Sequence, residues 1–241
     1  MLRRLDLGWF VRPGSETGDG RPRVEPALAY LVEHGGELML FDTGIGAADP
    51  ETDAHYRPRR RPLSAALRAA GVDAADIRLV VNCHLHFDHV GGNPLFAGTP
   101  ILAQAAELAL ARGDTGHTPE HLLDFAGARY EELSGEAEVR PGLWVVPTPG
   151  HTAGHQSLVV REPDGTVILA GQTHATASHF AAARLAQTAA AEREAAGSSA
   201  EPPDPQAPPL PAPDDGWPAR LLEFDPRRVL FAHDASVWEP V

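Results

Sequence analysis

The chain has 241 residues, 43% of them hydrophobic, and carries a formal net charge of −13. This length and apolar content are enough for one large globular domain or two small ones. The negative charge argues against nucleic acid as a partner, since the basic residues form only one short island, RPRRRP at 57–62. No apolar run approaches the ~20 residues of a membrane helix, so we expect no membrane partner.

Cysteine use and the N-terminal sequence indicate the compartment. The single cysteine, Cys83, excludes an internal disulfide and fits a reducing environment. The N-terminal stretch MLRRLDLGWFVRPGSE is too short and too interrupted in its apolar part to be a secretory signal. We therefore expect a cytoplasmic protein.

The N-terminal half has a β-α-β rhythm. Two apolar stretches within 27–43, separated by a His-Gly-Gly turn, predict a β-hairpin that ends at Asp42. A helix is predicted over 63–72. Residues 77–86 predict a buried strand that runs into a loop, because β-branched and apolar residues dominate until the histidines begin. The Ala/Leu-rich segment 101–112 predicts another helix.

The C-terminal half is predicted to hold a hairpin, a helix and a last strand. Strands are predicted over 143–147, 156–161 and 166–170, with Asp164-Gly165 as the hairpin turn, followed by an alanine-rich helix over 181–196 and a strand over 228–234. The proline-rich tract at about 197–215 is interpreted as a flexible loop, with a lid over the site as the alternative. Because strand 228–234 returns to the same core, we predict a single domain over 1–241.

One cluster of histidines stands out. His84, His86 and His89 lie with Asp88 in six residues just past a buried strand. Two histidines at i and i+2 on an extended segment point to the same side, so both imidazoles can reach one metal ion at about 2.0–2.1 Å. The glycines that follow, Gly91-Gly92, allow close approach of the backbone. The run predicts a metal site.

Four other residues are weaker candidates when taken singly. His151 and His155 lie in a turn between strands, and each alone is more typical of a hydrogen-bonded loop residue. His233 follows an apolar strand, and Asp42 at a strand end is equally consistent with a turn cap. Cys83 is interpreted as a packed core thiol.

Taken together, these segments resemble the metallo-β-lactamase-fold superfamily, and within it the branch of N-acyl-homoserine lactonases. The resemblance rests on FDTGIG at 41–46, HLHFDHVGG at 84–92, TPGHTAGHQSL at 148–158 and FAHD at 231–234, in the family's order. It implies an α/β fold, a four-layer αβ/βα sandwich. It also implies two zinc sites, with ligands His84, His86 and His151 for one ion and Asp88, His89 and His233 for the other. Asp42 would orient a ligand by a hydrogen bond.

The chain departs from this family at one position. Where the family usually has a bridging aspartate, this chain has Gln172 after Leu169-Ala170-Gly171. A neutral glutamine offers one carbonyl oxygen and cannot offset the charge of two dications, so we expect a more weakly held second metal. Three outcomes stay open: two ions without a carboxylate bridge, a single zinc, or His174 as a substitute ligand.

The resemblance also implies the chemistry. Zinc lowers the pKa of water to about 7, so that hydroxide attacks a lactone, ester or thioester carbonyl of a small-molecule substrate. Asp88 would position the nucleophile, and Gln172 or His174 would add a hydrogen bond to the substrate. The tyrosine that lactonases use for this purpose is absent, since the Ala175 region replaces it.

Other functions and metals are compatible with the same residues. A thioesterase, a glyoxalase-II-like or other specialised hydrolase of secondary metabolism, and a metal-binding pseudoenzyme that senses or sequesters a ligand share this ligand set. Iron, manganese and cobalt also suit histidine and aspartate ligands. The sequence does not determine the oligomeric state.

Overall fold

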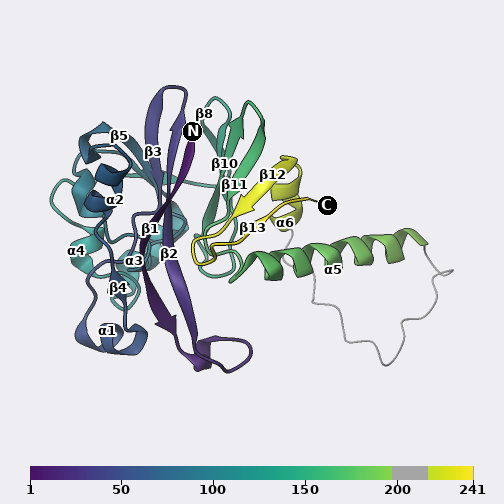
Figure 1. Ribbon diagram of the computed structural model, residues 1–241, viewed down its shortest axis with the longest axis horizontal. Helices are drawn as coiled ribbons and strands as arrows, with labels where there is room; N and C mark the ends of the chain where they lie inside the picture. The colour runs from purple at the N-terminus through teal and green to yellow at the C-terminus, as the bar shows by residue number, and fades with distance from the viewer. Residues whose placement is uncertain (197–216, 241) are drawn as a thin grey trace.

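The computed structural model describes residues 1–196 and 217–240, and its core is two mixed β-sheets (Figure 1). The first sheet has seven strands in the order β4-β1-β2-β3-β5-β6-β7, and the second has six in the order β13-β12-β11-β10-β9-β8. The strands of the first sheet are β1 (Leu2–Arg12), β2 (Arg23–His34), β3 (Glu37–Phe41), β4 (Arg59–Arg60), β5 (Ile77–Val81), β6 (Ile101–Gln104) and β7 (Tyr130–Leu133). Those of the second are β8 (Ala137–Arg140), β9 (Leu143–Pro147), β10 (Gln156–Glu162), β11 (Gly165–Leu169), β12 (Pro226–Leu230) and β13 (Val237–Trp238).

Helices lie outside the two sheets. The α-helices are α1 (Pro50–Tyr56), α2 (Leu63–Ala69), α3 (Ala105–Gly113), α4 (Glu120–Leu123), α5 (Ala177–Ala196) and α6 (Trp217–Leu222). Short 3-10 turns occupy η1 (Gly14–Glu16), η2 (Ala74–Asp76) and η3 (Asn93–Phe96). Among the described residues, no helix is long and apolar enough to span a membrane.

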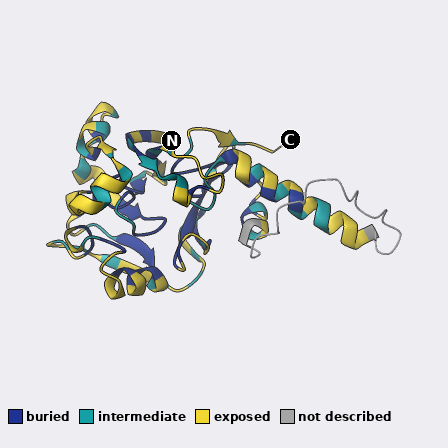
Figure 2. Cartoon of the chain, turned by 90° about the horizontal axis from the view of Figure 1, so that it is seen from below, coloured by how far each residue is buried: buried dark blue, intermediate teal, exposed yellow. Residues whose placement is uncertain are grey.

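The hydrophobic core forms in three layers between these elements. The central cluster joins the inner faces of both sheets, for example Tyr30 and Phe41 from the first and Val160 from the second. A second cluster packs α2 against the outer face of the first sheet, and a third packs α5 and α6 against the outer face of the second. Figure 2 shows the buried residues concentrated in the sheets and the exposed ones on the helices. The predicted αβ/βα sandwich is therefore confirmed.

Several predicted elements are present with shifted ends. The hairpin is β2–β3 with its turn at Gly35-Gly36, and β10 and β11 pair antiparallel on either side of Asp164. The predicted helix over 181–196 begins earlier, at Ala177, and the strand at 228–234 is β12, which ends at Leu230.

The segment 77–86, predicted as a buried strand that runs into a loop, is the strand β5 up to Val81 followed by the loop that carries the histidines. One predicted element was wrong in part. The helix predicted over 101–112 is divided into the short strand β6 and the helix α3. Ile101 and Leu102 pair with β5 in the centre of the sheet, so sheet pairing overrides the helical composition there. The tract at 197–215 lies outside the described residues.

Candidate metal centre

Five loops meet at one edge of the sandwich, each directly after a strand. They follow β3, β5, β9, β11 and β12, and they carry Asp42, the run from His84 to His89, His151, Gln172 and His233, respectively. Strand β3 is parallel to β5, and β11 is parallel to β12, so their carboxyl ends lie at a common edge. The topology thus brings together residues that are up to 191 positions apart in the sequence, from Asp42 to His233.

The first cluster contains three imidazoles. His84 Nε2 lies 2.9 Å from His86 Nδ1, which lies 3.1 Å from His151 Nε2. Each residue offers one ligand atom to a common point. These are the three residues that the sequence predicted as ligands of one ion.

The second cluster contains two imidazoles and a carboxylate. His89 Nε2 and His233 Nε2 are 3.1 Å apart, and Asp88 Oδ2 is 3.4 Å from the first and 3.3 Å from the second. Gln172 Oε1 faces the same nitrogens, at 3.3 Å from His89 and 3.2 Å from His233. The glutamine oxygen is thus a fourth potential metal-ligand atom of this cluster.

The spacing of these atoms fits a metal ion. Ligand atoms at 2.0–2.1 Å from a tetrahedral zinc lie about 3.3 Å from one another. The distances within the two clusters range from 2.9 to 3.4 Å. Nitrogen and carboxylate oxygen are also the donor types that zinc takes in hydrolases. Both clusters therefore fit the group that the sequence predicts.

The imidazoles of the first cluster are neutral at neutral pH and can therefore bind a cation. Burial lowers the pKa of His84 well below its ordinary value, and the neighbouring histidines lower it further. Burial likewise lowers the pKa of His86 to about 4. Since a metal binds only the unprotonated nitrogen, these lone pairs are available at neutral pH.

The second cluster attracts positive charge by a different means. Burial alone would lower the pKa of His89, but the facing carboxylates of Asp88 and Asp42 raise it instead. Burial would raise the pKa of Asp88, yet His89 and His233 hold it well below its ordinary value. A proton or a metal cation is therefore stabilised between these groups.

Asp42 forms hydrogen bonds with the loop that carries the histidine run, among them the bond to a candidate ligand that the sequence led us to expect. Its Oδ2 atom accepts from His89 Nδ1 at 3.0 Å and from Cys83 Sγ at 3.1 Å, and its Oδ1 atom accepts from Cys83 N at 2.8 Å. Cys83 Sγ also lies 3.2 Å from His84 Nδ1. The thiol is buried, as expected, but it belongs to the polar layer below both clusters.

His155 has a structural place, in agreement with its sequence interpretation. Its Nδ1 atom contacts Thr148, and its Nε2 atom accepts a hydrogen bond from the backbone N–H of Gln172 at 3.0 Å. Gly171, with φ +59°, lets this segment pass over Cys83, where a Cβ atom would come within 2.5 Å of Cys83 Cβ. These contacts hold Gln172 in position.

His174 lies apart from both ligand clusters. Its ring packs edge-on against Phe180 at 5.3 Å, and its Nδ1 atom is 3.4 Å from Thr173 Oγ1. Among the described residues it belongs to none of the groups that offer converging ligand atoms. Its role as a substitute ligand or substrate contact stays a prediction.

Sequence reasoning missed a buried glutamate, Glu107, in the first turn of α3. Its carboxylate accepts from Leu85 N at 2.9 Å and from Thr152 Oγ1 at 2.6 Å, so it links the loops that carry His86 and His151. The neighbouring His117, whose Nε2 atom lies 3.3 Å from Oε1, and hydrogen bonds from Thr152 and Leu85 outweigh burial and lower the pKa of Glu107 to about 2. A glutamate within an Ala/Leu-rich helix gave no signal of this contact.

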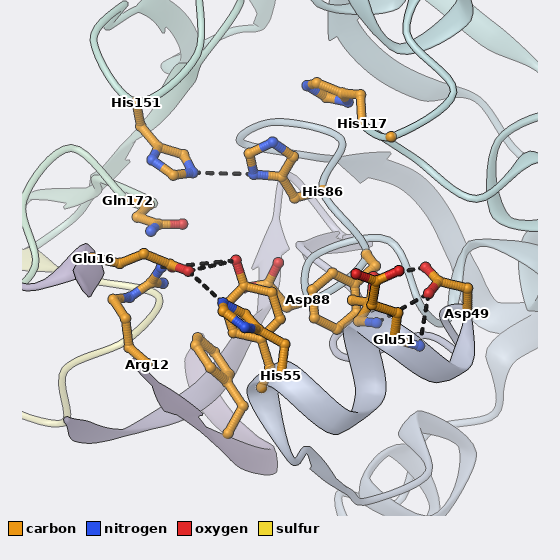
Figure 3. A pocket seen from close by; sticks show the side chains of 15 residues that line it. Arg12, Glu16, Asp49, Glu51, His55, His86, Asp88, His117, His151 and Gln172 are labelled. Atoms are coloured by element: carbon orange, nitrogen blue, oxygen red, sulfur yellow. Dashed lines mark hydrogen bonds and ion pairs between the residues drawn. The ribbon is translucent and has the colours of Figure 1, made fainter. Parts of the chain in front are cut away.

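A cavity of about 590 Å³ opens beside the two clusters (Figure 3). His86, His151, Asp88 and Gln172 line one part of it, and side chains of β1, η1 and α1 line another. This volume is within the range of small-molecule sites. The residues of the second part, which sequence reasoning also missed, are Phe10, Arg12, Glu16, Asp49, Glu51, Thr52, His55 and Tyr56.

The chain belongs to the Metallo-beta-lactamase superfamily, whose family profile matches residues 22–233. Within it, the chain is similar to N-acyl homoserine lactonases. It is 32% identical to that of Bacillus cereus over 197 residues, covering 75% of this chain and 74% of the relative.

Two further comparisons agree. The chain is 38% identical over 170 residues to an N-acyl homoserine lactonase of a Bacillus species, covering 64% of this chain and 66% of the relative, slightly less than two thirds of its length. A crystal structure of a mutant of Bacillus thuringiensis AiiA, with N-decanoyl-L-homoserine bound at the active site, superposes with a TM-score of 0.72. That match covers 97% of this chain and 93% of the other at 23% identity, which shows the shared fold.

Proposed function

We propose that the chain is a zinc-dependent hydrolase that opens the lactone ring of an N-acyl homoserine lactone. The observation that carries the proposal is the convergence of two sets of ligand atoms, at the spacing that a metal requires, beside a cavity of small-molecule size. The similarity to N-acyl homoserine lactonases supports the substrate class.

The chain's residues have distinct roles in this proposal. His84, His86 and His151 would hold one ion, and Asp88, His89 and His233 would hold a second. When bound, zinc would supply hydroxide at neutral pH and polarise the carbonyl that is attacked. Asp88 borders the cavity and would also orient the attacking nucleophile.

Gln172 is included in this proposal as a ligand of the second ion. Its oxygen faces His89 and His233, so it would be a neutral ligand of the second ion. It adds no negative charge to a site that has one carboxylate, Asp88. We therefore keep the expectation that the second ion is held less tightly than the first. That His174 contacts the substrate, and that the protein is cytoplasmic and folds as a single domain, are further parts of the proposal.

The test combines metal content with a substrate panel. We expect elemental analysis to find zinc and the purified protein to hydrolyse N-acyl homoserine lactones faster than thioesters or β-lactams. His86→Ala should lose both metal and turnover, whereas His121→Ala, an exposed histidine on α4, should lose neither. Bound metal without hydrolysis of any substrate would favour a pseudoenzyme, and faster thioester hydrolysis would favour a thioesterase.

A further inference from the structure

The side chain of Arg12, the last residue of β1, borders the cavity. This side chain is 13% exposed and borders the same cavity as His151, Asp88 and Gln172. In Figure 3 it lies beside Glu16, on the same side of the view as Gln172. Within the described part of the cavity wall it is the one lysine or arginine.

The guanidinium of Arg12 is held rigidly. Its Nε atom donates to Glu25 Oε2 at 2.7 Å, and its Nη1 atom donates to Glu16 Oε2 at 3.3 Å. Glu25 is itself buried and also bound by Arg23 at 2.5 Å. The guanidinium carbon lies 5.2 Å from the centre of the Phe10 ring. Because these contacts restrain the planar group, less entropy of ordering is lost on binding a ligand.

The remaining nitrogen of Arg12 is available to a ligand. Among the described residues, Nη2 has no hydrogen-bond partner, and it is not enclosed by protein atoms. The other donors on this wall are already used. Tyr56 Oη lies 3.2 Å from Glu16 Oε2, His55 Nε2 lies 2.8 Å from Glu16 Oε1, and Thr52 Oγ1 donates to Asp49.

The charges around the cavity specify the kind of acceptor. Four carboxylates border it, from Glu16, Asp49, Glu51 and Asp88, and since Asp88 would face a metal ion, three are left to face the ligand. An anionic ligand group would be repelled by them, while a neutral carbonyl oxygen accepts from a guanidinium without that penalty. The Nη2 atom of Arg12 is therefore suited to donate a hydrogen bond to a neutral amide or keto oxygen of a ligand.

We infer that Arg12 is a substrate-binding residue whose Nη2 atom donates a hydrogen bond to a neutral carbonyl oxygen beside the bond that is hydrolysed. In an N-acyl homoserine lactone this oxygen is the carbonyl of the acyl amide. The inference rests on the proposed function and adds to it the group that distinguishes an acylamino lactone from a plain one.

The test compares two variants on two substrates. Arg12→Lys keeps a positive charge for Glu25 and Glu16 but loses the second terminal nitrogen. Arg23→Lys is the matched control, since Arg23 binds the same Glu25 but does not border the cavity. The substrates are N-hexanoyl homoserine lactone and an α-alkyl-γ-butyrolactone of equal length without the amide.

For Arg12→Lys, we expect a rise in KM of about tenfold on the amide lactone, the effect of one hydrogen bond from a charged donor. Its kcat on that substrate and its KM on the alkyl lactone should stay near the wild-type values, and Arg23→Lys should change neither. An equal change of KM on both substrates, or no change on either, would overturn the inference alone. If the wild-type protein hydrolyses neither lactone, the proposed function fails and the inference with it. Should Arg12→Lys not fold, as judged by its melting temperature, Arg12→Gln is compared with Arg23→Gln, since both variants remove one positive charge from Glu25 and only the first removes a donor from the cavity.

Discussion

Asp42 illustrates how one carboxylate serves both ligand clusters. A histidine that binds a metal through Nε2 carries its proton on Nδ1 and needs an acceptor there. His89 donates directly to Asp42, whereas His84 faces Cys83 Sγ. Burial raises the pKa of the Cys83 thiol, so it keeps its proton and donates it to Asp42. The thiol thus connects His84 to the same carboxylate.

At residue scale, Gln172→Asp is expected to strengthen the second metal site. It adds a negative charge next to Asp88, His89 and His233, where a single carboxylate now faces a dication. We expect the affinity for the second ion to rise by about tenfold or more, the scale of changes around metal ligands. Zinc titration against a chromophoric chelator measures it, and Gln187→Asp, on the helix α5, would show whether a new carboxylate acts by itself. Unchanged affinity would place Gln172 outside the metal centre.

Glu107→Gln tests the link between two ligand loops. The amide keeps one oxygen but loses the charge that accepts from Leu85 N and Thr152 Oγ1, and it leaves His117 facing a neutral group. We expect a loss of about 1–3 kcal/mol in the free energy of unfolding, together with weaker binding of the first metal. Denaturant titration and metal content report the two effects.

The matched control for Glu107 is Glu132→Gln, whose side chain is 54% exposed beside Arg112. This pair is expected to contribute little, because exposed ion pairs are screened by water. Equal stability of the Glu107 and Glu132 variants would contradict the role of Glu107.

The sequence indicated which candidate ligand residues converge better than it indicated their surroundings. His84, His86, His89 and Asp88 are close in sequence, so their joint chemistry is visible in a pattern. The partners Glu107 and Arg12 lie in unremarkable segments, and only the fold brings them to the site. The orientation of Gln172 likewise depends on backbone contacts with His155 that no local pattern encodes.

At the scale of elements, the loop that carries the histidines is held against a neighbouring loop by close backbone contact. Gly91 N donates to Gly44 O at 2.7 Å, and a Cβ atom on Gly91 would lie 2.2 Å from Gly46 N. The sequence predicted this close approach from the glycines after the histidine run. The neighbouring loop is the one that carries Asp42, so this contact fixes the distance between Asp42 and His89.

Gly91→Ala is therefore expected to separate the two loops. We expect a loss of about 1–3 kcal/mol in stability, as for other overpacked sites, and a lower metal content. Gly113→Ala, at the end of α3, has no atom within 4 Å of the new Cβ atom and should be neutral. If the melting temperatures of the two variants agree, the contact does not constrain the loop.

Prediction of the elements failed where sheet pairing overrode composition. The segment from Ile101 reads as helical, yet its first residues complete a strand between β5 and β7. The strand β1 gave no clear prediction, although it pairs with β2 over most of its length. Such pairings depend on long-range partners, and a local window of sequence does not contain them.

For the whole molecule, buried neutral histidines predict how stability depends on pH. Burial lowers the pKa of His84, and it lowers the pKa of His86 and of His155 to about 4, while the pKa of His89 is raised. The pKa of His151 is lowered as well, to about 2. Between pH 6.5 and 4 these histidines bind protons in the unfolded chain before they do so in the folded chain, whereas His89 is protonated in both states over this window. Stability of the metal-free protein should fall as the pH falls through this window.

The slope of that dependence is roughly 1.4 kcal/mol per pH unit for each proton in excess. Denaturant titrations of the chelator-treated protein at several pH values measure it. A stability that is constant or rises from pH 6.5 to 4 would contradict the burial of neutral imidazoles at this edge of the sandwich.

In the proposed function, two metal ions at the edge where the five loops meet carry lactone hydrolysis. This role of the ions is tested most directly by stripping the protein with a chelator and measuring N-hexanoyl homoserine lactone hydrolysis while zinc is added back per chain. We expect that activity is lost on stripping, returns with added zinc and saturates at two ions per chain, the second binding more weakly. Activity that survives stripping, or that does not return at any zinc ratio, would contradict it.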